Sequence, residues 1–62
     1  MSTDISAIVA FIIAAPTPEE LIKRFQISAK NNPQHIMELH KNVYFHIKNA
    51  LNEINSVIPQ SD

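Results

Sequence analysis

The chain has 62 residues, of which 45% are hydrophobic and 18% charged, and its net charge at pH 7 is −1. This composition is typical of a single globular domain, 1–62, and the balanced charge excludes a strongly basic field for nucleic acid or anionic membranes. Neither cysteine nor glycine occurs, so disulfides, thiolate metal sites and glycine-rich nucleotide-binding loops are excluded.

The first predicted helix covers residues 4–14, with Ser2 or Thr3 as its N-cap. Its apolar side chains cover the whole circumference: Ile5, Ile8, Val9, Phe11, Ile12 and Ile13. A helix that is apolar all round must be buried on all sides, and one small chain offers too little protein to do this. The segment is also shorter than the roughly 20 residues of a membrane span, and no Lys or Arg precedes it as in a secretory signal. We therefore expect a cytoplasmic protein without a membrane anchor.

The second predicted helix covers residues 18–30 and follows a capping box, Thr17-Pro18-Glu19-Glu20. Glu19 and Glu20 precede Lys23 and Arg24 by four residues, the spacing of ion pairs on an exposed helical face. An apolar stripe on the opposite side consists of Leu21, Ile22, Phe25 and Ala29. Ile27 lies outside this stripe and needs a second surface to cover it.

The third predicted helix covers residues 33–57, with Asn32 as its cap and Pro33 at its first position. Its apolar residues repeat at intervals of seven: one row is Ile36, Val43, Ala50 and Val57, a second is Met37, Tyr44, Leu51 and Ile58, and His40, Ile47 and Ile54 lie between them. The stripe is about 160° wide, which indicates contact with two or more neighbouring helices. Since the first two helices in series have about the length of the third, we expect both to lie along it. The tail, 59–62, should be frayed.

These elements predict an all-α fold in which helices 18–30 and 33–57 form an antiparallel hairpin. Helix 4–14 packs against the third helix or is exchanged with a second copy. Because the apolar surface exceeds what one chain can bury, we expect a homodimeric helical bundle. The predicted oligomer interface consists of Ile5, Ile8, Val9, Phe11, Ile12, Ile13, Ile27, His40, Val43, Ile47 and Ile54.

The histidines are the residues most suited to chemistry, yet their spacing does not favour a site. His40 lies in the middle of the apolar stripe, which predicts a hydrogen-bonded core histidine in preference to a pH sensor. His35 and His46 share a polar rim with Asn42, Asn49 and Glu53. No two histidines have the i, i+4 spacing of a helical metal site, and no serine lies in a glycine elbow. We expect no catalytic residue, metal, cofactor or small-molecule substrate.

The function that this pattern favours is protein binding, as a small regulator, adaptor or inhibitor that presents a helical surface to a larger partner. Phe45 stands alone on the polar side of the third helix between Lys41 and Lys48, and is the predicted anchor of that surface. The alternative is a helix-turn-helix DNA-binding regulator using Glu20 to Ser28, with Ile27 under the turn and Ser28 capping a recognition helix. Pro33 inside that recognition helix, and glutamates beside the lysines, disfavour this alternative.

Overall fold

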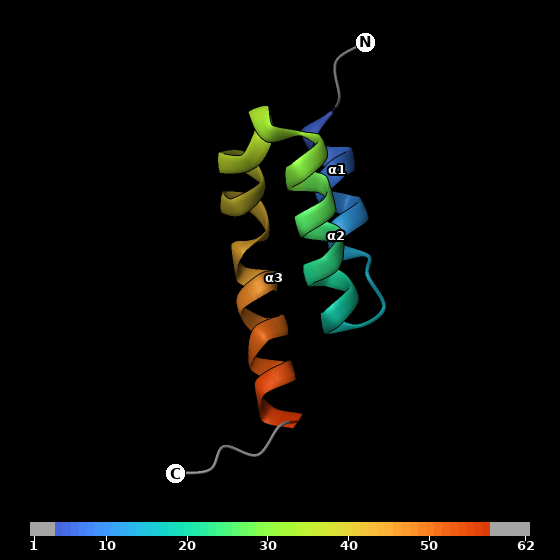
Figure 1. The fold of residues 1–62 in the computed structure, drawn as a ribbon, viewed down its shortest axis with the longest axis vertical. Helices are drawn as coiled ribbons and strands as arrows, with labels where there is room; N and C mark the ends of the chain where they lie inside the picture. Colours follow the sequence, from blue (N-terminus) through green and yellow to red (C-terminus); the bar gives the residue numbers. More distant parts are fainter. Residues whose placement is uncertain (1–3, 58–62) are drawn as a thin grey trace.

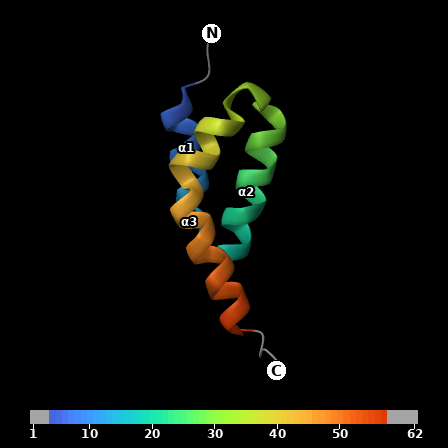
Figure 2. The same ribbon diagram turned by 90° about the vertical axis from the view of Figure 1, so that its left-hand side faces the viewer.

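The structure is a computed structural model that describes residues 4–57. All regular structure in this range is helical: α1 (Ile5–Ile13), α2 (Pro18–Asn31), the 3-10 turn η1 (Pro33–His35) and α3 (Ile36–Val57). The helices α1 and α2 lie side by side along the N-terminal part of α3, whose C-terminal part extends beyond both (Figures 1 and 2). The predicted all-helical fold with three helices is thus confirmed, whereas Ile58 and the tail 59–62 lie outside the described residues.

Asp4 is the N-cap of α1, where Ser2 or Thr3 had been expected; those two lie outside the described residues. The Asp4 carboxylate accepts a hydrogen bond from the Ser6 amide at 3.0 Å. An aspartate cap satisfies one of the free amides of the first turn, and its charge faces the positive end of the helix dipole.

Thr17 caps α2 as predicted: its hydroxyl accepts a hydrogen bond from the Glu20 amide at 3.1 Å, and Pro18 occupies the first position. The carboxylate of Glu20 forms the expected i, i+4 ion pair with Nε of Arg24 at 3.2 Å. It is the single ion pair within residues 4–57, so the corresponding pair of Glu19 and Lys23 is not formed there.

Asn32 ends α2 in place of capping the following helix. Its backbone amide and its side-chain Nδ2 both donate to the Ser28 carbonyl, at 2.9 and 3.1 Å. The chain then makes the 3-10 turn η1, and the α-helix starts at Ile36, three residues later than predicted. Asn32 makes no side-chain cap to η1.

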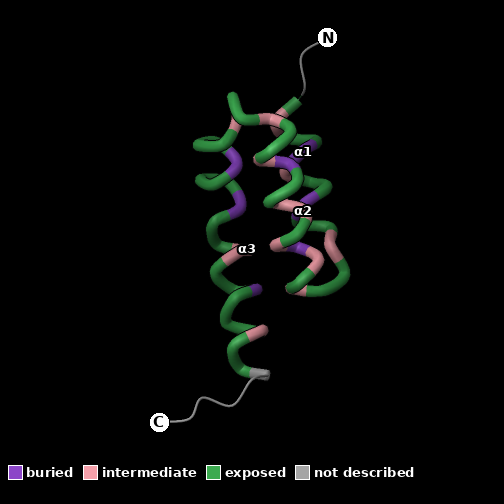
Figure 3. The backbone as a smooth tube through the Cα atoms, in the orientation of Figure 1, coloured by how far each residue is buried: buried purple, intermediate pink, exposed green. Residues whose placement is uncertain are grey.

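The core lies where the three helices face one another (Figure 3). Its buried hydrophobic members come from all of them: Ile8, Ile12, Leu21, Leu39, Val43 and Ala50. Ser28, also buried, contributes a small side chain from α2. The α1 and α2 side chains Ile5, Val9, Ile22, Phe25 and Ala29, together with Ala15 and Ile47, pack against this core while partly exposed.

The expectation that α1 and α2 both lie along α3 is confirmed, but they lie side by side and not in series (Figure 1). The segment Ala14–Thr17 reverses the chain, so that α1 contacts both α2 and α3. The complete burial expected for α1 is also not found: Ile8 and Ile12 are buried, but Phe11 and Ile13 remain 50% and 41% exposed. One side of α1 is therefore core and the other is surface.

Candidate functional site

The exposed apolar surface of α3 is the most prominent candidate site, and it arises because the wide stripe of this helix is divided in two. Leu39, Val43 and Ala50 are buried against α1 and α2. The remaining half lies roughly a quarter-turn around the helix, at about 100° per residue. We call this half the seam and define it as Met37, His40, Tyr44, Ile47, Leu51 and Ile54.

Most of the seam is open to solvent. Met37 is 86% exposed, Tyr44 52% and Leu51 47%; His40 is exposed as well, and Ile47 and Ile54 are half-buried. Single exposed apolar residues are common on monomers, but a row of them along five turns of one helix is not. The seam therefore marks a surface on which another molecule can pack.

His40 belongs to this surface and not to the core, so the prediction of a buried, hydrogen-bonded histidine was wrong. Its ring lies against that of Tyr44, one turn later, with centroids 5.3 Å apart and planes tilted by 57°. The residue that fills the core at this level is its neighbour Leu39, which is completely buried. Leu39 was absent from the predicted stripe, although its i, i+4 spacing to Val43 carried the signal.

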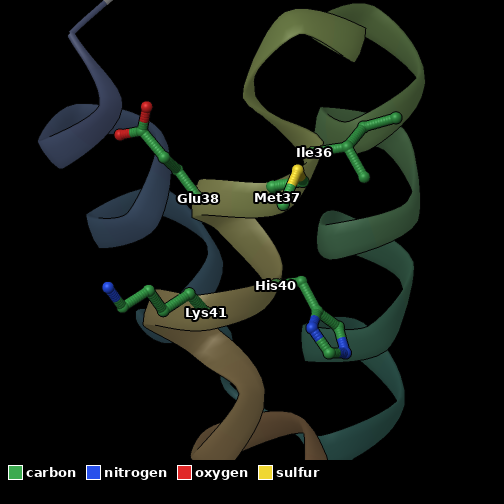
Figure 4. A pocket seen from close by; sticks show the side chains of 5 residues that line it. All are labelled: Ile36, Met37, Glu38, His40 and Lys41. Atoms are coloured by element: carbon green, nitrogen blue, oxygen red, sulfur yellow. The ribbon is translucent and has the colours of Figure 1, made fainter.

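A hollow of about 600 Å³ lies at the N-terminal end of the seam, lined by residues of α3. Figure 4 shows Ile36 and His40 on the side of α3 towards α2, Glu38 and Lys41 on the other side, and Met37 between them. Its lining is mainly apolar carbon and no polar groups converge within it. It therefore has the character of a docking surface and not of a catalytic pocket.

The second candidate surface is on the side of α3 away from the core and borders the seam at the two lysines; it consists of Phe45 with Lys41 and Lys48, and we call it the back face. Phe45 is 67% exposed and both lysines are exposed, as the sequence predicted for these three residues. The Phe45 ring makes an edge contact with His46, with centroids 5.8 Å apart. An exposed aromatic side chain bordered by cations is suited to an apolar socket with an acidic rim.

The residues predicted for an oligomer interface are placed in two environments. Three of them, Ile8, Ile12 and Val43, are buried within the chain's own core. The other eight are either exposed, as are Phe11, Ile13, Ile27 and His40, or half-buried, as are Ile5, Val9, Ile47 and Ile54. Only this second group can contact another chain while the fold is kept.

Arg24 joins α1 to α2 and is not free to contact phosphate. Its guanidinium lies 4.6 Å from the centroid of the Phe11 ring, and Nη1 donates to the Phe11 carbonyl at 2.9 Å. That carbonyl belongs to the last turn of α1, where backbone acceptors lack helical partners. With Glu20 on its Nε, Arg24 therefore completes the end of one helix from the surface of another.

The turn required by the DNA-binding alternative is not formed. Ile27 and Ser28 both lie inside α2, which continues unbroken to Asn31. Ser28 is buried and caps no helix, while Ile27 is 47% exposed and packs under no turn. The exposed isoleucine thus has a different explanation: it faces solvent on the side of α2 away from the core.

The predicted polar rim is only partly brought together. His46, Asn49 and Glu53 line one shallow hollow with the segment Ala15–Pro18. Asn42 lies beside α1 in another hollow and donates to the Glu38 carbonyl at 2.8 Å. His35 is half-buried in η1, and its Nδ1 is buried without a hydrogen-bond partner. Across residues 4–57 no three His, Asp or Glu side chains are grouped so as to hold a metal ion.

Comparison with protein-family models, with curated proteins and with solved structures gives no match. Within the described range, no helix has the length and apolar character needed to cross a membrane. The two surfaces of α3 are therefore the candidate functional sites of the chain.

Proposed function

We propose that this chain is a non-enzymatic protein–protein interaction module that acts as a homodimeric helical bundle and presents the back face of α3 to a larger partner. The observation that carries the proposal is that α3 exposes apolar side chains on two separate faces, the seam and Phe45. A single extended row suits a constitutive contact between copies, and a lone aromatic anchor suits recognition of a second protein.

The exposed apolar side chains support association. Within residues 4–57, eight large hydrophobic side chains are at least 41% exposed. Three of them, Met37, Tyr44 and Leu51, lie in the seam, so they form a row and are not isolated surface residues.

The back face is tested by replacing Phe45 with Ala. Truncation of a central aromatic anchor typically costs at least about 2 kcal/mol, so the variant should bind its partner about 30-fold more weakly. Because Phe45 is 67% exposed, the unfolding free energy should change by less than about 0.5 kcal/mol.

The measurement is capture of partner proteins from a lysate of the native host by the tagged chain, followed by mass spectrometry. Asn52→Ala is the matched control, since Asn52 is exposed on the same side of α3 and has no aromatic ring. Loss of a partner with the Phe45 variant, but not with the control, supports the back face. Equal capture by both variants would overturn its assignment.

A further inference from the structure

The seam has the register of a two-stranded coiled coil. Met37, Tyr44 and Leu51 stand at intervals of seven, and His40, Ile47 and Ile54 follow each of them by three residues. These are the a and d positions of a heptad repeat. The complete stripe of α3 is too wide for such a seam, but α1 and α2 cover its other half. The exposed half of the stripe is therefore as narrow as the contact between two helices of a coiled coil.

We propose that a second copy of this chain occupies the seam, with the two α3 helices parallel about a twofold axis. This inference rests on the homodimer of the proposed function and specifies its contact and its orientation. A second copy is the occupant that the observations favour, because its own seam supplies a row of matching repeat and length without Asp, Glu, Lys or Arg. A second copy is also present whenever the chain is made. This matters because a core of six buried hydrophobic residues is marginal and needs support from association.

The orientation follows from the residues that flank the seam. On one flank, the e positions, are the exposed Lys41 and Lys48; on the other, the g positions, only Ile36 is exposed, because Val43 and Ala50 are buried under α1 and α2. In an antiparallel pair centred on the seam, e positions face e positions, so Lys41 of one chain would lie beside Lys48 of its partner. In a parallel pair each lysine flank faces the other chain's g flank, where Ile36 and the covering helices lie, and not the other chain's lysine flank. The α3 lysines of the two chains are therefore kept apart only in the parallel arrangement.

The absence of cysteine from the chain makes a direct test possible. Met37→Cys, Tyr44→Cys and Leu51→Cys each place one thiol at an a position, and all three replaced side chains are largely exposed, so the fold is kept. In a parallel pair every a position lies opposite its own mate, close to the separation that a disulfide requires. In an antiparallel pair only the position nearest the twofold axis does so.

Each variant is oxidised at micromolar concentration, and the products are separated by mass. The molecular mass of the unmodified protein is measured by sedimentation equilibrium. We expect disulfide-linked dimers from all three seam variants and none from Asn52→Cys, on the far side of α3. Linkage of Tyr44→Cys alone would overturn the parallel orientation. A dimer by sedimentation with no linkage at the seam would overturn this contact but leave the proposed homodimer intact, whereas a monomer would overturn both.

Discussion

At the scale of single residues, Leu39 and Leu51 show how one side chain type serves two purposes on one helix. Leu39 is completely buried, whereas Leu51 is 47% exposed in the seam. We predict that Leu39→Ala lowers the free energy of unfolding by about 2–5 kcal/mol, because it leaves a cavity between three helices. Urea denaturation monitored by circular dichroism measures this loss.

Leu51→Ala is the matched control, since it deletes the same atoms from the same helix. At concentrations where the protein is monomeric, it should cost less than about 1 kcal/mol, because the side chain is already half in water. Equal losses for the two variants would contradict the assignment of Leu39 to the core and of Leu51 to the surface.

Local chemistry made some of these residue roles predictable. The four residues from Thr17 to Glu20 are enough to predict a helix start, and the structure has the Thr17 cap. His40 and Leu39 could not be separated in the same way, because they are adjacent and both lie near a wide apolar stripe. Which of them is buried depends on the side of α3 on which α1 and α2 pack, and this is a tertiary property.

At the scale of elements, the contact between α1 and α2 depends on Arg24. The fold-back of α1 was not predicted because residues 14–17 contain no glycine, and the reversal depends on tertiary contacts that leave little trace in local sequence. One of these contacts is the planar guanidinium, which stacks on the Phe11 ring and donates to the Phe11 carbonyl while it holds Glu20.

We predict that Arg24→Lys destabilises the chain by about 1 kcal/mol, although the charge is kept, because an ammonium group cannot stack and bridge at once. Lys23→Arg is the control, since Lys23 is exposed and outside this contact. Thermal unfolding measures both variants. An Arg24→Lys variant as stable as the parent chain would show that the contact does not contribute to stability.

At the scale of the whole molecule, the two faces of α3 divide its surface between two kinds of contact. The seam is adjacent to α2 and continues the packing of the bundle, while the back face is polar around one aromatic side chain. The sequence predicted both the excess of apolar surface and the exposure of Phe45. It assigned the excess to both α1 and α3, and the most extended exposed row lies on α3, since the reversal at residues 14–17 allows α2 and α3 to cover one side of α1.

If folding and association are coupled through the seam, thermal stability must depend on protein concentration. A tenfold increase in concentration stabilises a dimer by about 1.4 kcal/mol. With an unfolding entropy of about 2.1 cal/mol/K per residue, this raises the melting temperature of a dimer of two such chains by about 5 °C. Tyr44→Glu places a charge in the middle of the seam, so its melting temperature should be lower and independent of concentration. Melting by circular dichroism over a hundredfold range of concentration measures both proteins; a constant melting temperature for the parent chain would show that it folds without a second copy.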